Sequence, residues 1–343
     1  MFEVNLGGIK NTIINGNCLD ELKQISDNSI DLVITSPPYY KQREYSGIGI
    51  GNEQTEKEYL ANLITVFNEC VRVTKNTGAI VFNMGDKYVD SGLRLLPHRF
   101  AIQVIDSKKA FLINNLTWEK LNPTPRQDKK KLVQSTEPFF IFAKTKDYVF
   151  NLDDFMSHLK AMSGSKTKIT GGNGIGKKYF ELIDSSDLAP QEKEDAIKGL
   201  QRTILDVKSG VIESFRMKIR GIHAEPYGGQ PGGRQIQMDK KGFTIIRING
   251  EKLKRDIIES PVESIRNTQH PAVYPQFIIQ ELIKLLSKPN AVVLDPFAGS
   301  GTTCIAARNL NRNFIGIEIS PTYVKYAVER LKTGEPFLEE LFV

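Results

Sequence analysis

Four residues near the N-terminus could do chemistry because they follow a predicted buried strand. Ser36-Pro37-Pro38-Tyr39 comes shortly after the apolar run at residues 30–34, which is typical of such a strand. The two prolines fix their φ angles and provide carbonyl oxygens without a competing N–H. The pattern therefore predicts a rigid, acceptor-rich corner at the carboxyl edge of a sheet. Taken alone, the same residues are also typical of a stiff exposed turn.

A glycine turn near the C-terminus is the second segment whose residues could do chemistry. The apolar run at residues 291–294 leads into Asp295-Pro296-Phe297-Ala298-Gly299-Ser300-Gly301-Thr302. A strand, a Gly-x-Gly turn and a helix let the backbone approach a nucleotide closely, and Glu318 ends the next predicted strand, where an acid suits a ribose diol. Asp295 would repel a pyrophosphate, and Cys304 stands where a dinucleotide motif has its third small residue. A cationic or amino-bearing ligand therefore fits better than a dinucleotide.

The elements that must position these residues alternate between strand and helix at both ends of the chain. The predicted strands, separated by helical patterns, are residues 12–14, 30–34, 79–82, 291–294 and 314–318. Such alternation predicts an α/β fold with a Rossmann-like, doubly wound, mostly parallel sheet. Neither end holds enough strands for a complete sheet, so we expect one sheet that draws strands from both.

The middle of the chain has a different composition. The whole chain of 343 residues carries a net charge of +6. Residues 151–256 hold 19 Lys and Arg against 14 Asp and Glu, and 19 minus 14 gives +5 of that charge. We therefore divide the chain into residues 1–150, an insert at residues 151–261, and residues 262–343. The basic insert permits a polyanionic partner, and a loop region with solvated lysines is an equally good interpretation.

Composition excludes several classes of protein. The chain is 40% hydrophobic and 25% charged, which is ordinary for a globular protein. No apolar run approaches the about 18 residues of a membrane span, and the first residues do not resemble a signal peptide. The three scattered cysteines, Cys18, Cys70 and Cys304, form neither a disulfide framework nor a zinc site. We expect a soluble, cytoplasmic protein without a metal.

Together the two motifs resemble the S-adenosylmethionine-dependent DNA amino-methyltransferases, which methylate N4 of cytosine or N6 of adenine. Further segments agree. His270-Pro271-Ala272-Val273-Tyr274-Pro275 resembles the cofactor-side motif of that family, and Trp118-Glu119-Lys120 with Ser135-Thr136-Glu137-Pro138 resembles the region near its target base. The target-base motif precedes the glycine turn, which resembles the β order of motifs and implies a circularly permuted methyltransferase fold.

The resemblance also implies roles for individual residues. The catalytic corner would be Ser36, Pro37, Pro38 and Tyr39, with the Ser36 side chain and the Pro37 carbonyl accepting hydrogens of the target amine and Tyr39 stacking on a flipped base. S-adenosylmethionine is the implied cofactor, and the residues implied to bind it are Asp295, Pro296, Phe297, Gly299, Gly301, Thr302, Glu318, Asn17, His270 and Pro271. Asn17 stands where the family often has an acid that meets the adenine. Either Asn17 or Asp20 takes that place, and we favour Asn17.

The insert is then expected to be the target-recognition region for double-stranded DNA. The candidate DNA contacts, in the insert and in the loop before it, are Arg126, Lys129, Lys130, Arg216, Lys218, Arg220 and Arg234. Each of them alone is also typical of a solvated charge, and the sequence does not say which one reads a base.

The choice of substrate and even of activity stays open at this point. Serine at the first motif position favours cytosine-N4, with adenine-N6 as the alternative. Methylation at ring carbon 5 needs a Pro-Cys nucleophile, and no cysteine here follows a proline. An RNA methyltransferase and a catalytically inactive DNA-binding regulator are two further hypotheses, and the intact motifs argue against the regulator. We expect the modification enzyme of a restriction–modification system. The recognition sequence, the existence of a paired endonuclease that shares the target, and the choice between monomer and dimer stay open.

Overall fold

The computed structural model describes residues 11–41, 49–123, 130–156, 175–212, 214–223, 234–248, 254–262 and 274–333. The chain forms two compact units. The larger contains Met1–His158 and Lys254–Val343, and the smaller contains Leu159–Leu253. In the described part of the chain, no helix has both the length and the apolar character needed to cross a membrane.

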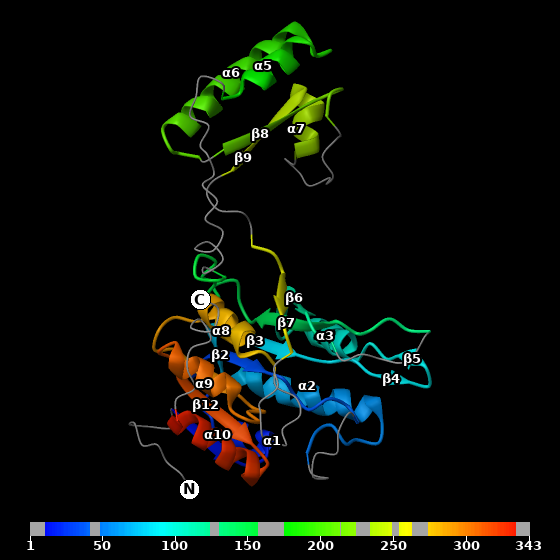
Figure 1. The fold of residues 1–343 in the computed structure, drawn as a ribbon, viewed down its shortest axis with the longest axis vertical. Helices are drawn as coiled ribbons and strands as arrows, with labels where there is room; N and C mark the ends of the chain where they lie inside the picture. The colour runs from blue at the N-terminus through cyan, green and yellow to red at the C-terminus, as the bar shows by residue number, and fades with distance from the viewer. Residues whose placement is uncertain are drawn as a thin grey trace. The chain divides into compact units, whose positions relative to one another are not determined.

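The larger unit is built on an eight-stranded sheet with the order β1-β12-β11-β2-β3-β7-β6-β10 (Figure 1). Its strands are β1 Thr12–Asn15, β2 Ile30–Thr35, β3 Thr74–Asn83, β6 Phe111–Lys120, β7 Thr136–Ala143, β10 Ile257–Ser260, β11 Val292–Asp295 and β12 Asn313–Glu318. The first five strands of that order are mutually parallel, and β7 runs antiparallel to both β3 and β6. The expected mostly parallel α/β fold is confirmed. So is the expectation of one sheet from both ends of the chain, because β11 and β12 lie between β1 and β2.

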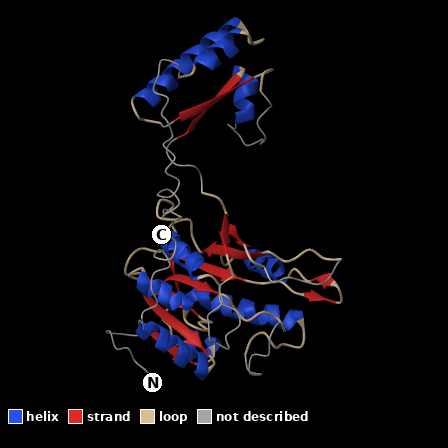
Figure 2. Ribbon diagram, viewed as in Figure 1, coloured by secondary structure: helices blue, strands red, loops and turns tan. Residues whose placement is uncertain are grey.

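Helices cover both faces of this sheet (Figure 2). On one face lie α1 Cys18–Leu22, α2 Glu56–Val73 and α3 Leu96–Ser107, and on the other lie α8 Gln276–Leu286, α9 Thr302–Asn309 and α10 Pro321–Thr333. Strand β2 shows how the sequence divides its side chains between the faces. Val33 packs in the cluster with α2 and α3, whereas Leu32 and Ile34 pack in the cluster with α8 and α9. Adjacent strand residues point to opposite faces, so a fully buried strand reads as a continuous apolar run.

A topological switch point lies between β11 and β2. The two strands are adjacent and parallel, but α9, which follows β11, and α2, which follows β2, cover opposite faces of the sheet. In open α/β sheets ligands bind outside the carboxyl ends of the strands at such a point. The two motifs that the sequence singles out follow these two strands, so a ligand is expected at this edge.

Helix α2 is defined by its N-terminal cap and by the strand that follows it. Thr55 Oγ1 accepts a hydrogen bond from the Glu58 amide at 3.2 Å, and the Glu58 carboxylate accepts one from the Thr55 amide at 3.0 Å. This capping box satisfies two amides at the start of the helix. The helix ends at Val73, and β3 begins at once with Thr74, earlier than the predicted strand at 79–82, because Thr74 pairs with Ile30 before a register shift.

The expected insert, residues 151–261, is longer than the smaller unit. Strand β10 pairs in parallel with β6, and Trp118 Nε1 donates to the Ser260 carbonyl at 3.0 Å. At the other boundary, the Asn151 amide donates to the Leu285 carbonyl at the end of α8 at 2.7 Å. The segments around Asn151 and Ser260 therefore belong to the large sheet and its helices, which corrects both boundaries inward.

The smaller unit has its own core. It contains α5 Lys177–Asp184, α6 Pro190–Lys208, β8 Ser214–Ile219, α7 Arg234–Lys241 and β9 Phe243–Ile248. Strands β8 and β9 form an antiparallel pair. Ile183, Leu200 and Met217 are buried together between the helices and this pair.

Candidate active site

The carboxyl ends of β2 and β11 bring the two motifs into direct contact. Thr35, the last residue of β2, donates from Oγ1 to Asp295 Oδ1 at 2.5 Å, although the two residues are 260 positions apart in the chain. Ser36 follows Thr35 directly. The acceptor-rich corner and the glycine turn therefore form one site at the carboxyl edge of the sheet, beside the switch point.

Asp295 is the buried centre of this contact, with 1% of its surface exposed. Besides Thr35, Oδ1 accepts from the Phe297 amide at 3.0 Å. Oδ2 accepts from the Thr303 hydroxyl at 2.6 Å and from the Tyr274 hydroxyl at 3.1 Å. Burial raises the pKa of Asp295, against the lowering effect of these donors. A carboxylate has about four acceptor positions, and these four donors occupy them. Asp295 therefore acts on a ligand only through the residues that it holds.

The glycine turn needs its glycines for two separate reasons. Gly299 and Gly301 have φ angles of 52° and 82°, in the left-handed region that disfavours side chains. A Cβ on Gly301 would also lie 2.9 Å from the Cβ of Ala327 in α10. The next turn of α10 supports the same loop, because Arg330, which is only 7% exposed, donates to the Ser300 carbonyl at 2.8 Å.

Cys304 occupies the position where the sequence lacks a third small residue. A Cβ on Gly316, in β12, would lie 2.9 Å from Cys304 Sγ and 3.0 Å from the Cβ of Ala298. The close approach of helix and strand that dinucleotide sites obtain from a small helix residue is here obtained from a glycine on the strand. The departure from the dinucleotide pattern therefore leaves the close packing of α9 on the sheet intact.

Glu318 and Asn17 lie at the ends of two neighbouring strands, β12 and β1. Glu318 Oε2 accepts from the Gly299 amide at 2.9 Å, and Oε1 accepts from the Ser320 amide at 2.8 Å. Burial raises the pKa of Glu318. These two bonds leave acceptor positions on the carboxylate for a diol. Asn17 caps α1, its Oδ1 accepting from the Leu19 amide at 3.0 Å, and its contact with an adenine stays a prediction.

Three further residues that are predicted to bind the cofactor lie at the glycine turn. Pro296 and Thr302 are buried, and Phe297 is half-buried against the core cluster that contains α2. The predicted contacts of these residues with a cofactor stay predictions. His270 and Pro271 lie outside the described residues.

Tyr39 ends the acceptor-rich corner in a network of polar side chains. Its hydroxyl donates to Glu137 Oε2 and to Asn83 Oδ1, each at 3.1 Å, and accepts from Ser36 Oγ at 3.4 Å. Burial, followed by the nearby Glu137 charge, raises the pKa of Tyr39 well above its ordinary value, so the phenol remains a donor. The Pro38 carbonyl accepts from the Tyr59 hydroxyl at 3.0 Å and is already used inside the protein.

Several residues with supporting roles in the site are not among those predicted from the sequence. Asn83, directly after the apolar residues of β3, could have been found because a polar residue at a strand's carboxyl end is a site signal. Arg330 could have been found because it lies three and six positions after Ala327 and Val324, on the apolar face of α10. Tyr274 and Glu137 stand within quoted motifs, but nothing local indicates which partners they bind.

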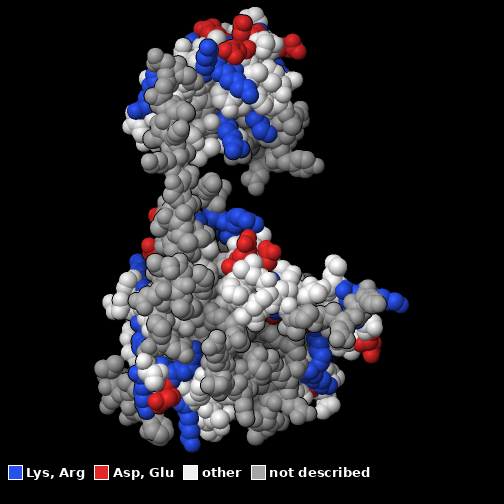
Figure 3. All heavy atoms as spheres, viewed as in Figure 1, with Lys and Arg blue, Asp and Glu red and all other residues white. Residues whose placement is uncertain are grey.

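The predicted DNA contacts have diverse environments. On β8, Arg216 is exposed and Lys218 is half-buried, and their spacing of two places both on one face of the strand. Arg220 differs, since its guanidinium bonds to both carboxylate oxygens of Glu192 at 3.0 and 2.7 Å. Figure 3 shows side chains of both charge signs on the visible face of this unit. Lys130 is exposed in the larger unit.

The other three predicted contacts cannot be placed as side chains. Arg126 and Lys129 lie outside the described residues, and Arg234 begins α7 with a side chain that is not described.

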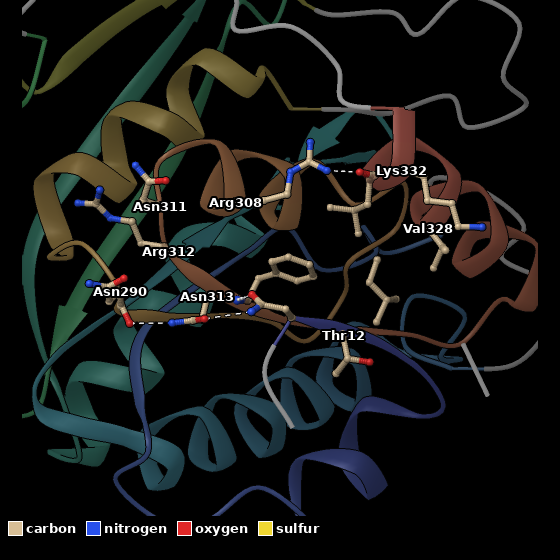
Figure 4. A pocket seen from close by; sticks show the side chains of 12 residues that line it. Thr12, Asn290, Arg308, Asn311, Arg312, Asn313, Val328 and Lys332 are labelled. Carbon is tan, nitrogen blue, oxygen red and sulfur yellow. Dashed lines mark hydrogen bonds between the residues drawn. The ribbon is translucent and has the colours of Figure 1, made fainter. Parts of the chain in front are cut away.

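A cavity of about 410 Å³ lies apart from this site (Figure 4). Its lining includes Thr12 and Asn313, which begin β1 and β12, and Asn290, which precedes β11. These are the amino ends of the strands, opposite the edge that holds Ser36 and Asp295. Asn313 Nδ2 donates to the Asn290 carbonyl at 2.9 Å across one side of the cavity. The cavity is therefore not part of the candidate active site.

The fold and the joined motifs define a methyltransferase of the amino-methylating class. The chain belongs to the N6/N4 family of DNA methylases, whose family model matches residues 30–329 and so includes both the Ser36 corner and the glycine turn. S-adenosylmethionine is the methyl donor of this family. The expected family, fold class and cofactor are thus confirmed.

Individual relatives agree with this assignment, and solved structures share the fold. The chain is 29% identical over 327 residues to the Type II methyltransferase M.BglII of Bacillus subtilis, covering 95% of this chain and 70% of the relative. It is 26% identical over 380 residues to M.SfiI of Streptomyces fimbriatus, covering 92% and 89%. The PvuII DNA methyltransferase (cytosine-N4-specific) shares the fold with a TM-score of 0.58 at 17% identity, over 96% of this chain and 89% of that one. A DNA modification methylase of Thermus thermophilus, solved with S-adenosyl-L-methionine, aligns with a TM-score of 0.53 at 19% identity, over 95% and 94%.

The residues at the edge fit this cofactor. The turn at Gly299 and Gly301 brings backbone to the carboxyl edge of the sheet, and Glu318 keeps acceptor positions for a ribose diol. When bound, S-adenosylmethionine supplies a methyl group on a positively charged sulfur.

Proposed function

We propose that this protein methylates the exocyclic N4 of cytosine in double-stranded DNA, as the modification enzyme of a Type II restriction–modification system. The observation that carries the proposal is the Thr35–Asp295 hydrogen bond, which places Ser36 beside the glycine turn. An acceptor for the target amine and the binding place of the methyl donor then share one edge. Serine at this position, together with the fold of the cytosine-N4-specific PvuII enzyme, favours cytosine over adenine.

The chain's own residues would act by orientation and electrostatics. The lone pair of an exocyclic amine is delocalised into its ring, so the amine is a poor nucleophile until it pyramidalises. Ser36 Oγ and the Pro37 carbonyl would accept the two amine hydrogens and turn the lone pair toward the methyl group. Because Ser36 directs its own proton to Tyr39, its lone pairs are available to the amine. Tyr39 would stack on the base.

The smaller unit would recognise the target in the DNA. Flipping a base costs a few kcal/mol of stacking and pairing. Phosphate contacts from cations such as Arg216 would offset that cost and make DNA affinity fall with salt. A protein with this role acts in the cytoplasm, and a cognate endonuclease would share its target, as the Type II relatives suggest.

The test is to identify the methylated base. Unmodified duplex DNA is incubated with the protein and S-adenosylmethionine, digested to nucleosides and analysed by mass spectrometry. N4-methylcytosine is the expected product. N6-methyladenine would replace the cytosine assignment by its alternative, and methylation of RNA but not duplex DNA would reject the substrate. No methylated nucleoside, with the fold intact, would favour the inactive DNA-binding regulator.

A further inference from the structure

The Tyr39 hydroxyl is held by residues whose role neither motif explains. We propose that Glu137 is a positioning residue for Tyr39, and that with Lys120 and Asn83 it holds the tyrosine ring at the corner where the target base is methylated. The inference rests on the proposed function, because it concerns the residue that would stack on the base. It adds a mechanism by which strands on the far side of β3 control catalysis.

The contacts at the hydroxyl come from two different strands. Glu137 lies on β7 and Asn83 ends β3, and each accepts from Tyr39 Oη at 3.1 Å. A phenol has one proton, so the two acceptors share it, and hydrogen bonds to a charged acceptor are about twice as strong as neutral ones. Glu137 is therefore the stronger of the two restraints on the hydroxyl.

Glu137 cannot easily turn away from Tyr39. Its second carboxylate oxygen, Oε1, accepts from Lys120 Nζ on β6, and the side chains of Lys120 and Glu137 are only 16% and 14% exposed. Lys120 Nζ also lies 5.0 Å from the ring centre of Trp118. Moving the carboxylate would leave a mostly buried ammonium without its partner, which is expensive. Asn83 is restrained too, because its Nδ2 donates to the Pro138 carbonyl at 3.2 Å.

The edge of the Tyr39 ring is also confined. A Cβ added to Gly85 would lie 2.4 Å from Tyr39 Cε2 and 2.8 Å from Cδ2. The backbone after β3 therefore lies against the ring where no side chain could fit. Fixing the hydroxyl and one ring edge leaves the tyrosine little freedom in either side-chain torsion, so the stacking surface is formed before the base arrives.

Folding alone does not account for this arrangement. A mostly buried ion pair contributes little net stability compared with well-packed apolar residues, because desolvation offsets the attraction. Phenylalanine at position 39 and apolar residues at 120 and 137 could fill the same space. The polar contacts instead give the ring one orientation, which matters only if something must pack against it.

A double-mutant cycle tests the proposal. The full-length variants are Tyr39→Phe, Glu137→Ala and the double variant, with Glu329→Gln as control, a carboxylate that is 66% exposed on α10. We expect each single variant to lower kcat about 10-fold, or about 1.4 kcal/mol, while the Kd for S-adenosylmethionine stays within about 2-fold. The double variant should be no slower than the slower single variant, because both remove one contact. If the losses of kcat in the two single variants multiply in the double variant, or if Glu137→Ala keeps full activity, the proposal is overturned.

A second pair of variants removes the ambiguity of misfolding. Glu137→Ala leaves Lys120 unpaired, whereas Glu137→Met with Lys120→Met removes both charges and the acceptor for Tyr39 and nearly keeps the volume. This variant should melt like the wild type and still lose kcat. Gly85→Ala should lower kcat because the added methyl group displaces the Tyr39 ring, while Glu137 itself is unchanged. A 2-aminopurine at the target position should still fluoresce on binding in all of these variants, because base flipping precedes stacking on Tyr39. If the variant without both charges melts like the wild type and keeps its kcat, the inference is rejected.

The cycle also separates this inference from the proposed function. If the wild type methylates DNA and the effects multiply, only the positioning role fails. If the wild type methylates no nucleic acid, the proposed function fails and the positioning role fails with it.

Discussion

The carboxyl edge of the large sheet and the strand β8 of the smaller unit use polar residues in opposite ways. At the edge, Asp295 is 1% exposed and each of its two carboxylate oxygens accepts two hydrogen bonds. On β8, Arg216 faces solvent. Buried polar groups must satisfy one another because an unpaired one costs about 1–3 kcal/mol, whereas an exposed cation is satisfied by water. Changes at the edge should therefore have large effects that salt hardly alters, and changes on β8 should have small effects that depend on salt.

The largest effect is expected at Asp295. Asp295→Ala leaves the hydroxyls of Thr35, Tyr274 and Thr303 without their acceptor and loosens the glycine turn. Tyr274 and Thr303 also bond to each other, so at least two donors are orphaned. At about 1–3 kcal/mol each, they predict that the affinity for S-adenosylmethionine falls at least about 30-fold. Isothermal titration calorimetry measures it, with circular dichroism to verify folding. Retained affinity would place the cofactor elsewhere, and the contrast between the buried edge and the exposed β8 would fail.

Ser36→Ala should come next. Loss of one acceptor for the amine is expected to lower kcat about 100-fold, the scale seen when one preorganised polar contact is removed from an active site. The Kd for DNA should stay within about 2-fold, since one hydroxyl contributes little to a phosphate-dominated affinity. Steady-state kinetics and fluorescence anisotropy measure the two. An equal loss of both would count against the role of Ser36.

Arg216→Ala should have a smaller, salt-dependent effect. Loss of one phosphate contact is expected to weaken DNA binding uniformly across sequences and to reduce the slope of log affinity against log salt by about 1. Arg220→Ala is the matched control, because the Arg220 guanidinium is already bonded to Glu192. Its salt slope should change less. Identical slopes for the two variants would show that exposure on β8 does not decide which cation meets DNA.

The smallest effect concerns pH. Burial raises the pKa of Asp295 above the about 3.9 of an unfolded chain, so the folded protein binds this proton more tightly. That contribution to stability is present below about pH 4 and is lost as pH rises through the raised value. Asp295→Asn lacks the titration. The unfolding free energy of the wild type minus that of Asp295→Asn should therefore fall with rising pH in urea titrations, and a rising difference would contradict it.

The α/β parts near both chain ends could be predicted because their signals are local. Residues 30–34 and 314–318 are predicted as strands, and β2 spans Ile30–Thr35 and β12 spans Asn313–Glu318. Strand β6, Phe111–Lys120, is not predicted, because its apolar residues are interrupted by Asn114 and Asn115. Its state depends on β7 and β10, which pair with it on either side.

The residue types alone specify the kind of chemistry, because prolines and glycines restrict the backbone at their own positions. Pro37 and Pro38 need no distant partner to form a rigid corner, and Gly301 needs only its own φ angle to make the turn. Which side chains meet depends on the folded chain. Tyr39 bonds to residues 44 and 98 positions away, and Thr35 to one 260 positions away. Hydrogen bonds across a sheet depend on strand order, and strand order leaves no pattern in the residues that it joins.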